Sequence, residues 1–169
     1  MKTLLEIQKA VHANAVDKGW YQDRDLKHVD TFEAMEALIH SEIAEATECI
    51  REGQLTMFYT ATLKPCGLPS EIADIVIRIL DYQEAKNLYI PEICHEGNDI
   101  TVDEEGWTTI CLLTWTNMLH KLTAIGSYGN TVMACFGLAR ALDFDLDAAI
   151  LEKHEYNMTR SHRHGGKLA

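Results

Sequence analysis

The chain has 169 residues, of which 47% are hydrophobic, and a formal net charge of −11. This length and composition suit one domain with a hydrophobic core. The negative charge argues against a nucleic-acid groove, because duplex binding depends on neutralising phosphates with Lys and Arg. It does not exclude a phosphorylated small molecule that reaches the acids through a metal ion. The N-terminus lacks the apolar run of a signal peptide, and no stretch is long and uncharged enough to span a bilayer, so we expect a cytoplasmic protein without a membrane partner.

Helical periodicity and helix-end signals follow one another along the chain. The first predicted helix begins at the capping box of Thr3 and ends at Gly19. A second capping pattern opens a helix at Asp30, and Gly53 ends it. A third, strongly apolar helix starts at Pro69. These three helices hold most of the residues that suggest a function.

The rest of the chain continues the helical pattern around two irregular stretches. We interpret residues 54–68 as a connection and residues 88–106 as a loop insertion, since both contain proline and glycine. Further helices are expected over residues 107–125, 131–142 and 145–160. The sequence therefore predicts an all-α bundle of about five to six helices in a single domain, and an apolar third helix of this kind favours an oligomer that covers it.

Two short acidic motifs lie on the second and third predicted helices. Glu42 and Glu45 are three residues apart, as are Glu71 and Asp74, so each pair shares one face of its helix. Glu42 falls among apolar positions, and the third helix is apolar on nearly all sides and must be buried. Buried carboxylates are costly unless they are paired or bind a cation. One interpretation is a solvated stripe of Glu71, Asp74 and Asp81 that is ion-paired with Arg78, with Glu42 merely at a helix boundary. The two motifs together favour a site for Mg²⁺ or Mn²⁺, which prefer oxygen ligands.

Basic groups gather on the last predicted helix and beyond it. Lys153, Asn157 and Arg160 are spaced i, i+4 and i+7, and they continue the side of the helix that is expected to face the core. The tail then carries two glycines before Lys167. Glycine permits close approach of the backbone to a ligand, and Lys and Arg suit phosphate oxygens. The alternative is a solvated basic tail that balances an acidic protein.

At these residues the chain resembles the MazG-like branch of the all-alpha nucleoside triphosphate pyrophosphohydrolases. The family's E-x-x-E and E-x-x-D motifs correspond to the two acidic pairs. The segment 153–167 resembles the K-x-x-Y-N-x-x-R-x-x-R-H-G-G-K ending of small phage and bacterial members, and Gly19-Trp20-Tyr21 resembles the end of their first helix. Residues 88–129 share no motif with the family.

The resemblance implies Mg²⁺-dependent hydrolysis of a nucleoside or deoxynucleoside triphosphate to the monophosphate and pyrophosphate, by a homodimer or homotetramer. The acids Glu42, Glu45, Glu71 and Asp74 would bind the metal, with Glu45 as the general base. Lys153, Asn157, Arg160 and Lys167 would bind phosphates or sugar. His12, Trp20 and Tyr21 would lie near the base, although a structural role for each is an equal alternative. Two other functions stay open: phosphoribosyl-ATP pyrophosphohydrolase, and a non-catalytic bundle that binds a nucleotide or a protein.

Overall fold

The computed structural model describes residues 2–23, 25–26, 28–97 and 108–166. The described chain is all-α apart from one small hairpin, as predicted. Its helices are α1 (Leu4–Asp17), α2 (Val29–Arg51), α3 (Leu68–Ala85), α4 (Thr109–Ala124), α5 (Tyr128–Ala141), α6 (Leu146–Thr159) and the short α7 (Arg163–Gly166), with a 3-10 helix η1 (Glu92–Glu96). No helix in these described residues has the length and apolar character that crossing a membrane requires.

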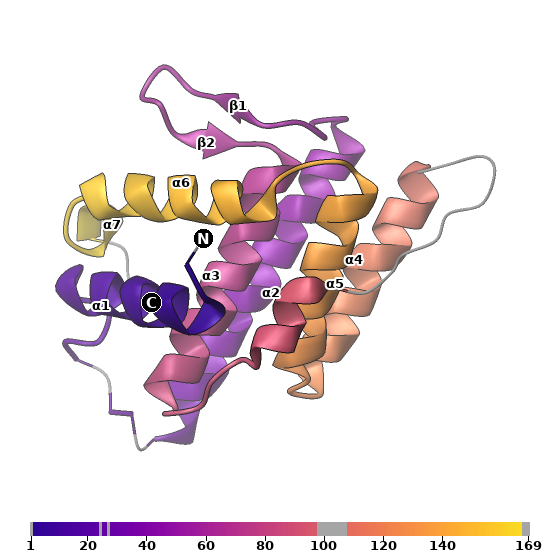
Figure 1. Ribbon diagram of the computed structural model, residues 1–169. Coiled ribbons are helices and arrows are strands. Elements are labelled where there is room, and N and C mark those ends of the chain that lie inside the picture. The colour runs from indigo at the N-terminus through magenta and orange to yellow at the C-terminus, as the bar shows by residue number, and fades with distance from the viewer. Residues whose placement is uncertain (1, 24, 27, 98–107, 167–169) are drawn as a thin grey trace.

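Helix α3 lies at the centre of the molecule. It packs against α1, α2, α5 and α6, and Figure 1 shows α1 and α6 lying across it. The side chains of Ile72, Ile75 and Ile79 are 0% exposed. Burial of such side chains stabilises the fold by about 1.5–3 kcal/mol each. A single chain supplies this cover, so the apolar character of α3 does not by itself require a second copy.

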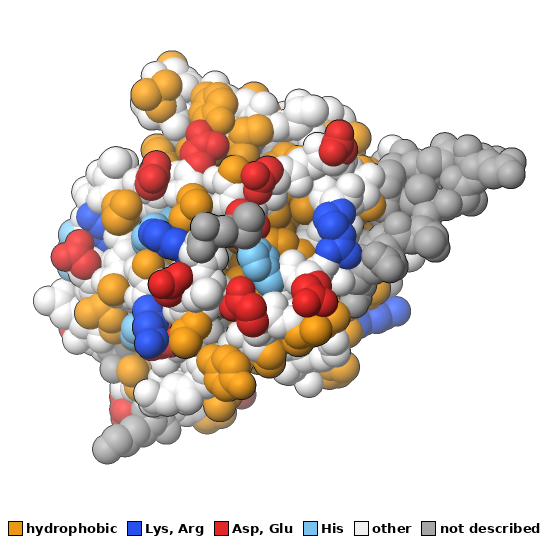
Figure 2. All heavy atoms as spheres, viewed as in Figure 1, with side chains coloured by type: hydrophobic (Ala, Val, Ile, Leu, Met, Phe, Trp, Pro, Cys, Tyr) orange, Lys and Arg blue, Asp and Glu red, His pale blue; other side chains and the backbone are white. Residues whose placement is uncertain are grey.

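Residues 54–68, predicted as a connection, contain a two-stranded antiparallel hairpin. Strand β1 (Phe58–Tyr59) pairs with β2 (Pro65–Cys66) in the register Phe58 to Cys66 and Tyr59 to Pro65. The hairpin projects from the helices, and Figure 2 shows hydrophobic side chains gathered on it. Gly67 links it to α3 with a φ of +93°, and a Cβ there would lie 2.2 Å from the carbonyl oxygen of Thr56. Only glycine fits this junction, which fixes where α3 begins.

The structure differs from the prediction at the starts of two helices and within one loop. Helix α2 begins at Val29, because the ring of His28 accepts the cap hydrogen bond from the backbone N–H of Asp30 at 3.4 Å. Helix α5 begins at Tyr128, three residues before the predicted start. The buried ring of Tyr128 packs on Tyr82, and this contact outweighs the weak helix propensity of the neighbouring residues. The predicted loop 88–106 contains η1, and residues 98–107 lie outside the described residues.

Candidate active site

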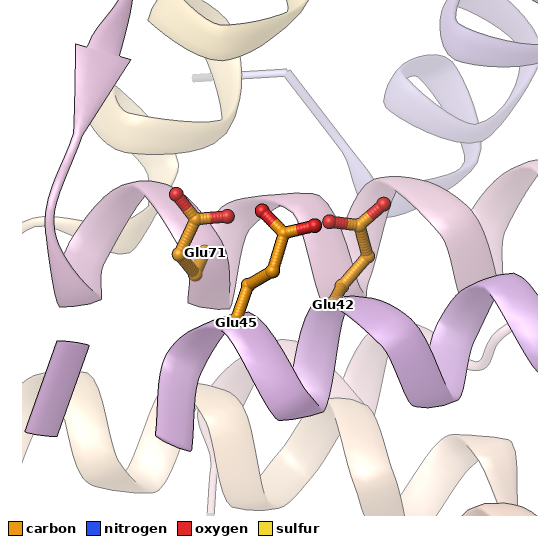
Figure 3. A group of neighbouring side chains, drawn as sticks. All are labelled: Glu42, Glu45 and Glu71. Atoms are coloured by element: carbon orange, nitrogen blue, oxygen red, sulfur yellow. The ribbon is translucent and has the colours of Figure 1, made fainter. Parts of the chain in front are cut away.

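Three of the four predicted metal ligands meet between α2 and α3. Glu42 and Glu45 lie one turn apart on α2, and Glu71 comes from the first turn of α3. One carboxylate oxygen of each lies within 4.8 Å of the other two, and Figure 3 shows the three side chains side by side. Glu42 and Glu71 are only 7% and 5% exposed, whereas Glu45 is exposed. Three carboxylate oxygens so close together form a ligand set suited to a hard divalent cation.

Asp74, the fourth predicted ligand, is held in an ion pair. Its Oδ2 lies 2.8 Å from the Nζ of Lys153. Lys153 is 2% exposed and also donates to the Oγ of Ser70 at 2.6 Å and to the carbonyl oxygen of Pro65 at 3.4 Å. The sequence predicts Asp74 as a metal ligand and Lys153 as a phosphate-binding residue, and the structure pairs the two with each other. Lys153 thus ties α6 to the start of α3, beside the acid cluster.

The acid cluster carries more negative charge than its neighbours neutralise. Burial raises the pKa of Glu71 to about 7, although the charge of Lys153 opposes this shift. Burial also raises the pKa of Glu42, and the nearby charge of Asp74 adds to the rise. Arg78 acts against it, because its Nε donates to Oε1 of Glu42 at 3.0 Å. Since one lysine and one arginine leave these pKa values high, added positive charge would stabilise the ionised carboxylates.

A cavity of about 240 Å³ opens beside the cluster. Its acidic lining comes from α2 and α3: Glu42, Glu45, Asp74 and Asp81. Its basic lining comes from the hairpin, α3, α6 and the residue after α6: Lys64, Arg78, Lys153 and Arg160. Its apolar lining comes from α1, α2, α3 and the residue after Gly19: Val11, Ala15, Leu38, Ile77 and Trp20. Glu71 is not part of the lining, but it lies within 4.8 Å of two acids that are. The cavity therefore joins acidic, basic and apolar surfaces.

Two cations in this cavity have no carboxylate partner among the described residues. Lys64 comes from the hairpin, and Arg160 follows the last turn of α6. The guanidinium of Arg160 lies 6.0 Å from the ring centroid of Tyr156, and burial lowers the pKa of Arg160. Asn157 adds a buried Oδ1 that accepts no hydrogen bond within the described part of the chain. These groups are free to bind a ligand, whereas Lys167 lies outside the described residues.

Trp20 reaches the cavity because the chain turns sharply after α1. Gly19 has a φ of +79°, and a Cβ at this position would lie 2.0 Å from the ring of His162. The tail docks on this turn, since the backbone N–H of Arg163 donates to the carbonyl oxygen of Lys18 at 2.9 Å. Trp20 is 8% exposed, and its ring meets the ring of His164 edge-on with centroids 5.1 Å apart. The tail thus supports the aromatic wall of the cavity.

His12 and Tyr21 do not line the cavity, but both form a hydrogen bond with Asp81, which does. His12 Nδ1 lies 2.8 Å from Oδ1 of Asp81, and the Tyr21 hydroxyl donates to the same oxygen at 2.7 Å. The hydrogen bond to Asp81 raises the pKa of His12, which favours the protonated, donating ring. The two rings also pack edge-on, with centroids 4.8 Å apart. Both residues therefore have structural contacts, and Asp81 is the member of this group that lines the cavity.

The sequence does not indicate Lys64 as a candidate, and it indicates Asp81 only as a member of the charged stripe on the third helix. Lys64 lies in a segment without helical periodicity, so nothing in its spacing placed it near the acids. Asp81 carried a signal, since it lies seven residues after Asp74 on the same charged stripe of an apolar helix.

We compared the chain with protein-family models, curated proteins and solved structures, and none of them matches it.

Proposed function

We propose that this protein is a Mg²⁺-dependent nucleoside triphosphate pyrophosphohydrolase of the MazG-like all-alpha type. It would hydrolyse a nucleoside or deoxynucleoside triphosphate in the cytoplasm to the monophosphate and pyrophosphate. The observation that carries this proposal is the meeting of Glu42, Glu45 and Glu71 within 4.8 Å beside a cavity that also holds Lys64 and Arg160. A polyphosphate accompanied by a divalent cation needs both kinds of charge in one place.

The residues present fit the metal ion that this function requires. Glu42, Glu45 and Glu71 supply oxygen ligands, which Mg²⁺ and Mn²⁺ prefer. Burial raises the pKa values of Glu42 and Glu71, and the charges of the nearby acids add to the rise, so a cation would favour their ionised forms. Asp74 would keep its ion pair with Lys153. When bound, Mg²⁺ would supply positive charge to the polyphosphate and lower the pKa of the attacking water.

The side chains of the cavity account for the other parts of the reaction. Glu45 is the exposed acid of the cluster and would accept the proton of the attacking water. The water oxygen would form a bond to the α-phosphorus, the bond from that phosphorus to the oxygen bridging to the β-phosphate would break, and pyrophosphate would leave with the bridging oxygen. Lys64 and Arg160 would hold phosphate oxygens by charge-assisted hydrogen bonds. The amide of Asn157, whose Oδ1 is buried without a partner in the described residues, would orient a ligand donor.

Pyrophosphate release tests the proposal. The protein is incubated with Mg²⁺ and each common ribonucleoside and deoxynucleoside triphosphate, and with phosphoribosyl-ATP as the related alternative. We expect release from at least one nucleoside triphosphate, and we expect Glu42→Gln to lower kcat/KM by about a thousandfold, because an electrostatic contribution of several kcal/mol is lost. The control is Glu48→Gln on the same helix, where the exposed carboxylate pairs with Arg51 at 2.7 Å.

Four results would count against this function or change it. Release from none of the nucleotides would exclude it, and calorimetric binding of nucleotide and metal without turnover would favour the non-catalytic alternative. Equal activity of wild type and Glu42→Gln would show that the acid cluster takes no part in the reaction. Preference for phosphoribosyl-ATP would mean that the protein acts on that substrate by the same reaction.

A homodimer or homotetramer forms part of the proposal. Helix α4 and its C-cap residue carry three exposed apolar side chains, Ile110, Met118 and Ile125, which are 76%, 39% and 76% exposed. Apolar residues at such spacing share one face of a helix and are often covered by a partner. Light scattering should give at least twice the monomer mass, and the double variant Ile110→Lys, Ile125→Lys should give a lower mass. A monomeric wild type would remove this part of the proposal.

A further inference from the structure

Asp81 is a buried acid of the cavity that the acid cluster does not use. It lies on α3, is 9% exposed and lines the cavity together with Trp20 and Leu38. Its Oδ1 accepts hydrogen bonds from His12 Nδ1 at 2.8 Å and from the Tyr21 hydroxyl at 2.7 Å. Its Oδ2 accepts none within the described part of the chain. A carboxylate in this position is held firmly by one oxygen and offers the other to a ligand.

The place of Asp81 along α3 separates it from the phosphate-binding end of the cavity. Asp74 and Asp81 are seven residues apart, which corresponds to two turns and about 10 Å along the axis, on one face of the helix. This separation is comparable with the length of a nucleoside. The apolar residues Trp20 and Leu38 line the cavity at the Asp81 end, and together with Met35, Arg78 and Asp81 they line a small adjoining pocket. A nucleotide with its phosphates at the acid cluster would therefore bring its base to Trp20 and Asp81.

The chemistry of a carboxylate selects among bases. An ionised carboxylate only accepts hydrogen bonds. Cytosine, adenine and guanine carry an exocyclic amino group that donates to it. Uracil and thymine present one N–H between two carbonyl oxygens, and those oxygens would face the negative charge. We propose that Asp81 recognises the amino group of the base and makes cytosine, adenine and guanine nucleotides better substrates than uracil and thymine nucleotides. This inference rests on the proposed function.

The two hydrogen bonds to Oδ1 determine how the amide of an Asp81→Asn variant would be oriented. In Asp81→Asn, the carbonyl oxygen of the amide would take the place of Oδ1, because His12 and Tyr21 both donate to that place. The NH₂ group would then replace Oδ2 and face the base as a donor. The preference should shift from amino-bearing bases to bases with a carbonyl oxygen at the same position.

The test uses two pairs of nucleotides that differ in the amino group. Pyrophosphate release is measured for dCTP against dUTP and for dGTP against dITP, with Mg²⁺, in wild type, Asp81→Asn and the control Asp17→Asn at an exposed position of α1. Wild type and the control should prefer the amino-bearing member of at least one pair by about tenfold or more, as expected for a hydrogen bond to a charged group. In Asp81→Asn the ratio for that pair should fall to one or below.

The outcomes separate this inference from the proposed function. If the wild type hydrolyses none of the nucleotides, the proposed function fails, and this inference fails with it. If the wild type hydrolyses them with equal kcat/KM within each pair, or if Asp81→Asn keeps the wild-type ratio, this inference alone fails. Should melting curves show that Asp81→Asn does not fold, Tyr21→Phe decides: it loses one donor to Oδ1, and its ratio should fall severalfold, whereas an unchanged ratio would overturn the inference.

Discussion

Glu71 and Asp81 are acids of the same helix, and their surroundings differ. Glu71 is 5% exposed beside two other carboxylates, and burial raises its pKa to about 7. Asp81 is 9% exposed and receives two hydrogen bonds on one oxygen. The charge of Lys153 only partly offsets the burial of the first acid, whereas the second already has two donors on one oxygen. The difference teaches that neighbours decide what a buried carboxylate is suited to bind, and we propose a cation at the Glu71 end and a hydrogen-bond donor at the Asp81 end.

The largest expected effect comes from removing the buried cation of the Glu71 end. Lys153→Met leaves Asp74 without its ion-pair partner and Glu71 without the nearest compensating charge. We expect the free energy of unfolding to fall by about 3–5 kcal/mol, as when one partner of a buried pair is removed. Urea denaturation measures it, with Lys121→Met at an exposed position of α4 as the control.

The double variant Lys153→Met, Asp74→Asn should recover part of this loss, because the uncompensated charge is gone. A loss of less than about 1 kcal/mol in the single variant would indicate that the ion pair contributes little, as at a solvent-exposed site.

The next effect concerns the pH dependence of the metal-free protein. With a pKa of about 7 in the folded protein, Glu71 holds a proton that it gives up on unfolding. The folded state then binds more protons than the unfolded state, so the free energy of unfolding falls as pH rises from about 5 to 7. Glu71→Gln stays neutral, and at pH 8 in EDTA it should be more stable than wild type by about 2 kcal/mol.

Thermal or urea unfolding between pH 5 and pH 8 checks this prediction. Addition of Mg²⁺ should stabilise wild type at pH 8 and should not stabilise Glu71→Gln. A variant that is less stable than wild type across the whole range would show that Glu71 is ionised and well paired in the folded state, which would remove the contrast with Asp81.

A smaller effect is expected at the hairpin. Lys64→Ala removes a cation of the cavity that has no carboxylate partner in the described residues. We expect KM for the nucleotide to rise about tenfold, the size of one charge-assisted hydrogen bond, without a change in melting temperature. Lys121→Ala serves as the control. Unchanged kinetics would mean that Lys64 does not contact the phosphates.

The smallest effect belongs to the Asp81 end. Tyr21→Phe removes one hydrogen bond to Oδ1 and leaves that of His12. The free energy of unfolding should fall by about 1 kcal/mol, because Asp81 keeps a second donor. Urea denaturation decides, and a loss as large as that of Lys153→Met would show that the two ends do not differ in how their acids are compensated.

Local patterns predicted the helices well because capping and periodicity act over a few residues. Thr3 forms the predicted capping box of α1, and Asp145 caps α6 as expected. The cap of α2 was misassigned, because the ring of His28 can also accept the bond that the Asp30 pattern suggested. The hairpin was missed because its strands have two residues each and show no alternation.

The candidate site was predictable where it depends on one helix and not where it depends on distant segments. The i, i+3 spacing placed Glu42 beside Glu45, and the apolar character of α3 indicated that Glu71 is buried. The pairing of Asp74 with Lys153 joins residues 79 positions apart, and that of Asp81 with His12 spans 69. Such pairs are set by the packing of α1 and α6 on α3, which no local pattern contains.

The central claim is that Glu42, Glu45 and Glu71 together hold a divalent cation for a polyphosphate. Electron paramagnetic resonance tests it directly, because it measures free Mn²⁺ in the presence of a non-hydrolysable α,β-imido nucleotide. We predict saturable uptake of Mn²⁺ by wild type and by Glu48→Gln at pH 8, and loss of that uptake in Glu71→Gln. Equal uptake by wild type and Glu71→Gln, or none by either, would contradict the claim.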